Sequence, residues 1–122
     1  MALLFEELTG KILAACFEVS NELGAGFLES VYEKALLIAL NQKGISAVAQ
    51  YPIGVSFRGQ SVGQFNADIL VENKIIVEIK AVTNLAPEHK AQLINYLKAT
   101  GIEVGLLINF GKSKLEYRRF HK

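Results

Sequence analysis

The spacing of apolar residues changes near residue 45, and this change limits what the chain can fold into. Before it, apolar side chains recur every three or four residues, as on one face of an amphipathic helix. We therefore predict a helix over roughly residues 3–22 and a second from Leu28 to about 41–44, with a glycine-containing break at 24–26. After residue 45 the apolar residues alternate with polar ones or run together, which is typical of strands.

The rest of the chain predicts strands on both sides of one more helix. Pro87 suits the first turn of that helix, and Gly101 suits its end. A short strand is expected at 45–50, ended by Tyr51-Pro52, before the main strands begin. The main elements follow the order ααβββαββ, which permits a mixed sheet flanked by helices, an α/β fold. The main strands are expected at 53–58, 64–71, 75–82, 104–110 and 115–120, with a turn at 58–60.

Size and composition favour one domain with a substantial core. The chain has 122 residues, of which 51% are apolar and 20% charged, and this excludes disorder caused by low hydrophobicity. The mean hydropathy of +0.27 is high, yet charged residues interrupt every apolar run that approaches bilayer length. We interpret the apolar surplus as a core plus a hidden interface, such as that of a homodimer.

Cysteine content and the first residues indicate where the protein works. Cys16 is the single cysteine, which excludes an internal disulfide framework and a cysteine-based zinc cluster. The N-terminus lacks the basic start and the cleavage site of a secretory signal. We therefore expect a cytoplasmic protein.

The net charge of +1 hides an uneven distribution. Residues 1–111 contain 8 Lys or Arg and 11 Asp or Glu, a net of −3, whereas residues 112–122 contain 5 Lys or Arg and one Glu, a net of +4. Such a basic strip can neutralise phosphates; the alternative is a solvated tail that aids solubility. Its basic residues are Lys112, Lys114, Arg118, Arg119 and Lys122.

Two acidic residues and a lysine lie within strands that are otherwise apolar. Asp68, the only aspartate, belongs to the strand that ends at residue 71, and Glu78 and Lys80 belong to the next one. Glu78 and Lys80 are two residues apart, so they share a face of their strand. A three-residue loop at 72–74 would place Asp68 opposite Glu78, with Cβ atoms about 5 Å apart. A two-residue loop would instead turn the two carboxylates to opposite faces.

Two carboxylates at that separation repel each other unless one is protonated or a cation lies between them. Oxygen ligands suit a hard cation such as Mg²⁺ or Mn²⁺, which takes one or two carboxylates together with water and phosphate oxygens. Lys80 beside such a site could polarise an attacking water or stabilise charge on a phosphate. The alternative is an ordinary ion pair between Lys80 and one of the two acids at a sheet edge.

One motif on the helix after Pro87 supports the metal interpretation. Gln92 and Tyr96 form Q-x-x-x-Y and share a face of that helix. An amide and a phenol on one face could hold a water, Lys80 or a phosphate. The alternative is that they mark the boundary between the polar surface and the core face.

A second motif lies at the start of the second helix. Gly26, Glu29 and Tyr32 form G-x-x-E-x-x-Y, in which Glu29 lies at the edge of the apolar stripe and Glu33 lies further toward solvent. Glu29 could enter a cleft as a metal ligand, or it could merely complement the positive N-terminus of its helix. Tyr32 is expected in the core, with its hydroxyl on a hydrogen-bond partner.

Taken together, these motifs resemble those of the GxxExxY family of small bacterial and archaeal proteins, which belongs to the PD-(D/E)XK nuclease superfamily. The resemblance covers nearly the whole chain and implies one nuclease-like domain over 1–122, with a central mixed sheet flanked by helices. Each motif is weak alone, but the set is specific. Its carriers are Gly26–Tyr32, Ala67–Glu72, Ile76–Val82, Gln92–Leu97 and Gly105–Gly111.

The resemblance implies a role for each matched residue. By motif, Asp68 and Glu78 correspond to the two metal-binding acids, and Lys80 corresponds to the catalytic lysine. Two positions depart from the expected pattern: Ala67 stands where the superfamily has proline, and Asn66 stands where a basic residue is expected. The second departure could weaken phosphate contact without removing the metal site. The remaining correspondences are Glu29 with the acid of the helix before the sheet, the Ile79 carbonyl with a further metal ligand, and Gln92 and Tyr96 with the helix of exonuclease-like members.

We therefore expect a Mg²⁺-dependent nuclease that hydrolyses phosphodiester bonds of nucleic acid, DNA more than RNA. A second hypothesis is a non-cleaving nucleic-acid-binding or regulatory module with the same fold, which the weak positive charge favours. A third is a structural oligomer without a nucleic-acid role. The expected catalytic residues are Asp68, Glu78, Lys80, Gln92 and Tyr96; the metal ligands Glu29, Asp68, Glu78 and Ile79; the nucleic-acid contacts Lys112, Lys114, Arg118 and Arg119.

Overall fold

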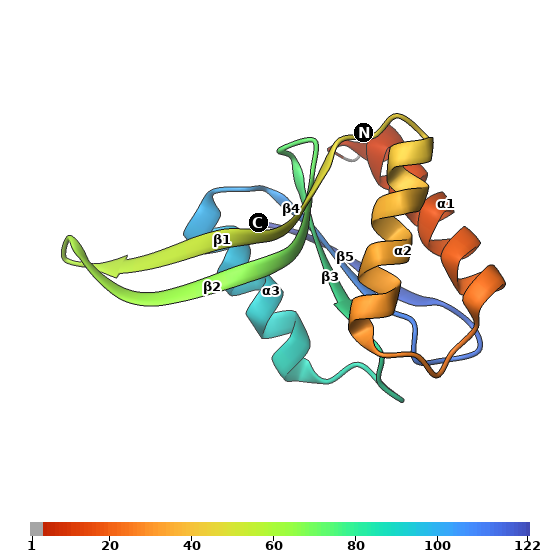
Figure 1. Ribbon diagram of the computed structural model, residues 1–122. Coiled ribbons are helices and arrows are strands. Elements are labelled where there is room, and N and C mark those ends of the chain that lie inside the picture. Colours follow the sequence, from red (N-terminus) through yellow and green to blue (C-terminus); the bar gives the residue numbers. More distant parts are fainter. Residues whose placement is uncertain (1–3) are drawn as a thin grey trace.

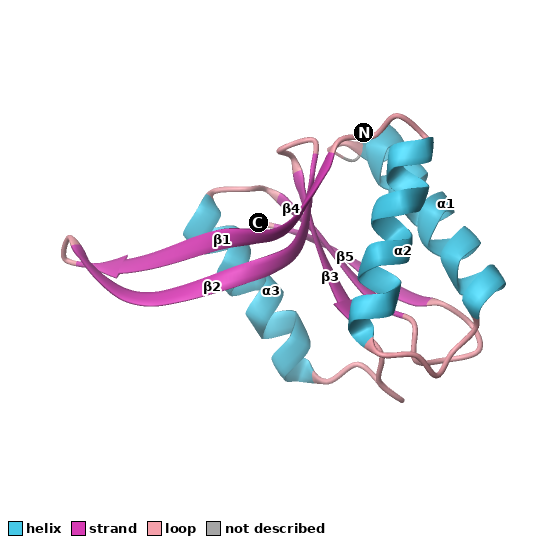
Figure 2. Ribbon diagram, in the orientation of Figure 1, coloured by secondary structure: helices cyan, strands magenta, loops and turns pink. Residues whose placement is uncertain are grey.

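A five-stranded mixed sheet organises the computed structural model, which describes residues 4–122. Its strands are β1 (Ala47–Phe57), β2 (Gln60–Val71), β3 (Ile75–Lys80), β4 (Val104–Asn109) and β5 (Glu116–His121), and its helices are α1 (Glu6–Leu23), α2 (Glu29–Gln42) and α3 (Pro87–Thr100). The strands lie side by side in numerical order, with β3 and β4 parallel and the other neighbours antiparallel (Figure 2). This confirms the predicted α/β fold and its order ααβββαββ. The predicted start of the first helix at residue 3 lies outside the described residues.

Helices cover both faces of the sheet. Helices α1 and α2 pack together against one face, and α3 packs against the other (Figure 1). The first core joins Ile12, Cys16 and Leu36 to the odd-numbered residues of β3, and the second joins Leu93 and Leu97 to Ile76. Strand β3 is therefore covered on both faces, and apart from Glu78 and Lys80 its residues are apolar, as is typical of central strands. Among the described residues, no helix is long and apolar enough to cross a bilayer.

Helix α2 is held at its start by Tyr32, which is fully buried as predicted. Its hydroxyl donates to the carbonyl of Gly24 at 2.6 Å and accepts from the amide of Phe27 at 3.2 Å. The Tyr32 ring also stacks on Phe110, with centroids 4.7 Å apart. These contacts join the glycine-containing break to the sheet, and so they set where the first turn of α2 lies.

The prediction that Tyr51-Pro52 ends a short strand is wrong. Strand β1 is continuous from Ala47 to Phe57, and Pro52 pairs with Asn66 of β2. The order of the sheet explains this, because β1 is an edge strand and a proline there can turn its missing donor toward solvent. Strand β2 likewise begins at Gln60 rather than at residue 64, because a two-residue turn with positive φ at Arg58 and Gly59 joins it directly to β1.

The hairpin of β1 and β2 leaves the body of the protein as a curved arm (Figure 1). Its twist changes sharply at Gln50, which has a φ of 54° and stands opposite Asp68 in the pairing of the two strands. On the inner side of this point Ile69 packs under α1 and α2, whereas on the outer side Ala67 packs with α3. Asp68 therefore lies at the position where the arm turns from one face of the sheet to the other.

The end of β3 is held by a buried asparagine in β4. The Asn109 side chain accepts from the amides of Val82 and Gly111 and donates to the carbonyl of Val82 and to Glu116, all between 2.9 and 3.0 Å. Gly111 fits this corner because a Cβ there would overlap the backbone N and O of Val82. The corner matters for function because Val82 is two residues beyond Lys80, so it sets where Lys80 lies.

We predict that Gly111→Ala lowers the free energy of unfolding by at least about 2 kcal/mol, because rigid backbone cannot move aside for the added methyl group. The matched control is Gly10→Ala, in the exposed interior of α1, where a Cβ meets nothing within 4 Å. This control should raise stability by about 0.5–1 kcal/mol, the difference in helix propensity. Urea unfolding followed by circular dichroism measures both; equal effects of the two substitutions would contradict the packing assigned to Gly111.

Candidate active site

Asp68 and Glu78 face each other across the gap between β2 and β3. The strands are joined by the predicted three-residue loop, with Val71 paired to Ile75 and Ile69 paired to Val77. Residues Glu72 and Asn73 of this loop both have positive φ. The next positions in the same register are Asp68 and Glu78, so the predicted loop length and its register are confirmed.

The two strands separate at this point, and a carboxylate takes over the hydrogen bond. The pairing of β2 with β3 ends at Ile69 and Val77, and the amide of Ile79 donates to Asp68 Oδ2 at 2.7 Å. The Lys80 carbonyl accepts from Phe110 on the β4 side, at 2.8 Å. Since successive carbonyls of a strand point to opposite sides, the Ile79 carbonyl faces the gap beside Asp68.

Glu78 is buried, with 3% of its surface exposed. Burial, followed by hydrogen bonding to Asp68 and the negative charge of Asp68, raises the pKa of Glu78 from 4.5 to about 9, although Lys80 opposes the shift. Glu78 therefore keeps its proton at neutral pH when no cation is bound, because burial and the neighbouring Asp68 both disfavour its charged form. Lys80 is half-buried and shares the face of Glu78, as predicted.

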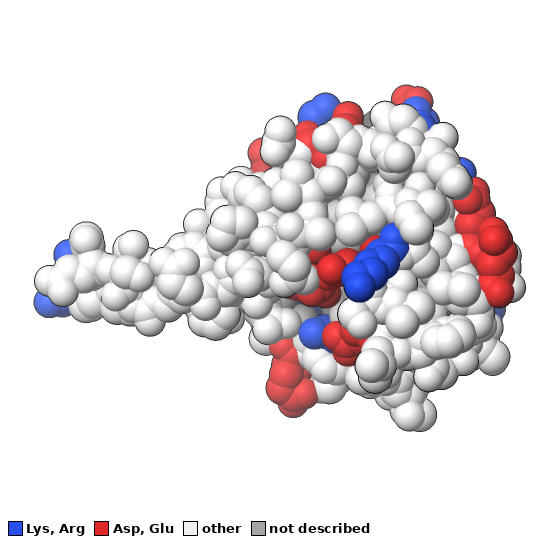
Figure 3. All heavy atoms as spheres, in the orientation of Figure 1, with Lys and Arg blue, Asp and Glu red and all other residues white. Residues whose placement is uncertain are grey.

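Asp68 also lines a small hollow under the start of α2. The hollow has a volume of about 200 Å³ and is lined by Glu29, Ser30 and Glu33 of α2, by Gln50 of β1, and by Asp68 and Ile79. Figure 3 shows acidic and basic side chains gathered in this central region, between the largely uncharged arm and helix α2. The predicted residue Glu29 is thus brought to the same hollow as Asp68.

Sequence reasoning missed Glu33 and Gln50. The prediction placed Glu33 toward solvent, but it is half-buried, and its carboxylate accepts a hydrogen bond from Gln50 Nε2 at 2.7 Å. Burial, together with the charge of Asp68, raises the pKa of Glu33. Glu29 is the more exposed of the two, and within residues 4–122 its carboxylate has no hydrogen-bond or ion-pair partner. The spacing of the two acids was the available signal, since residues four apart share one face of a helix.

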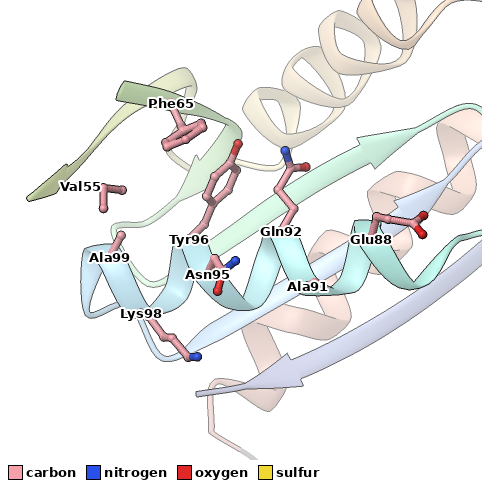
Figure 4. Close-up of a pocket in the computed structure, with 9 residues that line it drawn as sticks. All are labelled: Val55, Phe65, Glu88, Ala91, Gln92, Asn95, Tyr96, Lys98 and Ala99. Atoms are coloured by element: carbon pink, nitrogen blue, oxygen red, sulfur yellow. The ribbon is translucent and has the colours of Figure 1, made fainter. Parts of the chain in front are cut away.

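Helix α3 contributes the two predicted residues to the opposite side of the gap. Figure 4 shows the Tyr96 ring and the Gln92 amide pointing to the same side of α3. Tyr96 is buried, and its pKa is raised by burial, followed by the charges of Glu78 and Asp68. It packs in the same core cluster as Ala67, the residue before Asp68. Gln92 is exposed. The structure thus brings Tyr96 to the strand segment that carries Asp68 and leaves Gln92 at the surface.

The basic strip does not form one surface. Arg118 and Arg119 are adjacent in β5 and point to opposite faces of the sheet. The guanidinium of Arg119 donates to the carbonyl of Leu4 at 2.6 Å, and Lys112 lies 4.0 Å from Glu116. Arg118 has a different position: Leu107 pairs with both Glu78 and Arg118, so Arg118 lies two strands from Glu78 on the same face, roughly 10 Å away.

The acidic pair suits a hard divalent cation. Within residues 4–122 no three His, Cys, Asp or Glu side chains form a group that could hold a metal ion. Magnesium needs fewer protein ligands, because it keeps several waters and uses one or two carboxylates with phosphate oxygens. Asp68, Glu78 and the Ile79 carbonyl supply oxygen ligands at one gap, and a cation would offset both the burial of Glu78 and its repulsion from Asp68, the causes that raise its pKa. The donor set therefore fits Mg²⁺ or Mn²⁺.

We predict that the metal-free protein loses stability as the pH rises. The pKa of Glu78 is about 9 in the folded chain and near 4.5 in the unfolded chain, so between these values the folded state holds one more proton. The free energy of unfolding should therefore fall between pH 5 and pH 9, by at most about 1.4 kcal/mol per pH unit. Urea unfolding in EDTA at several pH values measures this slope.

Glu78→Gln should remove most of that slope and leave the protein more stable than the wild type at pH 9, because the amide stays neutral. Glu22→Gln, an exposed residue of α1, is the matched control and should keep the wild-type slope. A wild-type slope in Glu78→Gln would show that Glu78 is not the group that titrates.

Comparison with known proteins agrees with this arrangement. The family model described as PD-(D/E)XK nuclease superfamily matches residues 6–120. Among solved structures, that of SSO0001 superposes with a TM-score of 0.59 at 18% identity and covers 97% of this chain. An alkaline exonuclease (LHK-Exo) from Laribacter hongkongensis superposes with a TM-score of 0.56 at 12% identity and covers 100% of it. No curated protein matches the chain by sequence.

The two structural neighbours show the fold and are longer than this chain. The match spans 59% of the SSO0001 chain and 72% of the exonuclease chain. The match to the family model covers nearly all of the sequence, including the strands that carry Asp68, Glu78 and Lys80. The chain therefore belongs to the PD-(D/E)XK nuclease superfamily.

Proposed function

We propose that this protein is a Mg²⁺-dependent nuclease that hydrolyses phosphodiester bonds of nucleic acid, with DNA preferred to RNA. The observation that carries the proposal is the meeting of Asp68, Glu78 and Lys80 at the point where β2 and β3 separate. A buried Glu78 beside the half-buried Asp68 and Lys80 is costly for a fold unless it has a use. The exonuclease among the structural neighbours is consistent with this reaction class.

In this proposal Asp68 and Glu78 hold the metal ion, with the Ile79 carbonyl as a further ligand and Glu29 reaching it from α2. When bound, Mg²⁺ would stabilise negative charge on the phosphate and make a bound water more acidic. Asp68 has a second role, because its Oδ2 holds the amide of Ile79 and so fixes the gap. Glu78 must lose its proton for the ion to bind, so binding should release a proton near neutral pH.

Lys80, Gln92 and Tyr96 act on the reacting groups. Lys80 shares the face of Glu78 and would orient the attacking water or stabilise charge on the phosphate. Tyr96 packs in the same core cluster as Ala67, the residue before Asp68, and its hydroxyl would donate to a phosphate oxygen or to the attacking water. Gln92 lies at the rim on the same side of α3, where an amide can position the substrate backbone.

The basic residues near the end of the chain would contact the nucleic-acid backbone unequally. Arg118 shares the face of Glu78 and lines a hollow with Lys90, so it is best placed to reach a phosphate. Lys112 and Lys114 lie in the loop before β5. Arg119 would contribute least, because Leu4 already engages it on the other face.

A non-cleaving nucleic-acid-binding or regulatory module is the alternative. Two observations favour it: no preformed group of three metal-binding side chains lies within residues 4–122, and the net charge is only +1. In either case we propose a homodimer, which the exposed apolar residues Val48, Phe57 and Val62 of the arm support. A cytoplasmic location also stays a prediction.

We predict that the wild type cleaves DNA with Mg²⁺ or Mn²⁺ and that Lys80→Ala lowers the rate by roughly 10²–10⁴-fold, as expected when a positioned proton-transfer or charge-stabilising group is lost. Lys11→Ala, an exposed lysine of α1, is the matched control and should cleave like the wild type. Labelled single- and double-stranded DNA and RNA, each with and without EDTA, measure the rates. Equal products from the wild type and Lys80→Ala on every substrate would exclude the nuclease and leave the binding module.

We also predict different effects for the two acids of α2. Glu29 is free to reach a cation, whereas the Glu33 carboxylate is already bound to Gln50. Glu29→Gln should therefore weaken Mn²⁺ affinity about tenfold or more, and Glu33→Gln should weaken it less. Isothermal titration with Mn²⁺ measures both, and Glu72→Gln in the β2–β3 loop controls for loss of one negative charge. A larger effect of Glu33→Gln would reverse the assignment.

A further inference from the structure

A second hollow lies beside the proposed active site and is not explained by catalysis. It has a volume of about 700 Å³ and separates the arm from α3, with Val55 and Phe65 on the arm side and Gln92, Asn95 and Tyr96 on α3 (Figure 4). Tyr96 lines this groove and packs in the same core cluster as Ala67, the residue before Asp68. The groove therefore lies beside the strand segment that carries Asp68, where we propose that the phosphodiester bond is cut.

Phe65 is held as an exposed aromatic platform in this groove. It is 46% exposed, and its ring lies 6.0 Å from that of Tyr96 between centroids. A Cβ on Gly63 would come within 2.9 Å of the Phe65 ring, so the glycine leaves the space in which the ring lies along the strand. The ring is thus positioned by its neighbours while much of its surface remains open to a ligand.

The charges around the groove do not favour a phosphate backbone as its occupant. Its charged residues are Glu88 and Lys98, whose opposite charges give no net charge. Both side chains point away from Phe65 (Figure 4). Duplex nucleic acid presents its phosphates outward and is bound chiefly through cations. An exposed aromatic ring with exposed amides at Gln92 and Asn95 instead suits an unpaired base, which stacks on the ring and bonds to the amides through its edge.

We propose that this groove binds one unpaired base of single-stranded DNA, stacked on Phe65, next to the bond that is cut. The inference rests on the proposed function and deepens it by naming the form of the substrate. The remaining wall is formed by Val55, Ala91 and Ala99, which offer no partner to a ribose 2′-hydroxyl. Burying that hydroxyl without a partner disfavours RNA.

Binding of labelled oligonucleotides in EDTA, followed by fluorescence anisotropy, tests the proposal without cleavage. Phe65→Ala should weaken binding of mixed-sequence single-stranded DNA by roughly 5- to 150-fold, the range for one stacked base. Phe65→Trp should keep the affinity and Phe65→Leu should lose it, because stacking needs an aromatic ring. The salt dependence of binding should not change in Phe65→Ala, since no phosphate contact is removed.

Ile38→Ala is the matched control, because Ile38 is an exposed apolar residue of α2, which packs on the face of the sheet opposite α3. It should bind single-stranded DNA like the wild type, and thermal melting should show that every variant is folded. Equal affinities for Phe65→Ala and Ile38→Ala would overturn the proposal. Wild-type affinity in Phe65→Leu, or equal binding of single-stranded RNA, would also overturn it.

Cleavage measured on the same variants separates this inference from the proposed function. If the wild type cleaves and Phe65→Ala retains the same preference for single strands, the groove proposal fails and the nuclease stands. If neither the wild type nor Lys80→Ala cleaves, while binding of single strands depends on Phe65, the nuclease fails and the groove proposal stands.

Discussion

The hydrogen bond from the Ile79 amide to Asp68 is the interaction on which the site depends. It lies where β2 leaves β3, and it replaces a contact between strands with a contact to a carboxylate. A strand amide in a covered sheet needs a partner, so the strands can separate at this point only because Asp68 supplies one. Because the strands separate here, the Ile79 carbonyl and the two carboxylates all face the same gap. The side chain to which we assign metal binding is therefore also required for the local fold.

The change of twist at Gln50 allows residues of both α2 and α3 to lie beside the gap. If the hairpin stayed flat, every second residue along β2 would face α1 and α2, and only the residues between them would face α3. Instead Ile69 packs under α1 and α2 while Ala67 packs with α3. The turn between them places Asp68 beside the first turn of α2 and close to Tyr96 of α3 at once. It also carries Phe65 across to α3.

The parts of the site that depend on local geometry could be predicted from the sequence. Whether a hairpin loop has an odd or an even number of residues decides which side chains share a face. The three-residue loop was therefore sufficient to place Asp68 opposite Glu78. The continuity of β1 could not be predicted in this way, because Pro52 is tolerated only at a sheet edge, and edge position is a property of the whole sheet. The half-buried position of Glu33 could not be predicted for a similar reason. Both lie on one face of α2, and the contact with Gln50 that distinguishes them comes from a strand elsewhere in the chain.

The small net charge has a physical explanation in this arrangement. A protein that held its substrate chiefly through phosphates would need a broad basic surface, yet the arm carries one basic residue, Arg58, at its tip. Charged side chains lie instead on the body of the protein, including the gap, where acids that a cation would neutralise lie beside a lysine. The arm exposes apolar and aromatic residues, Phe57 and Phe65 among them. In our proposal this surface selects a substrate by stacking, which an unpaired strand offers.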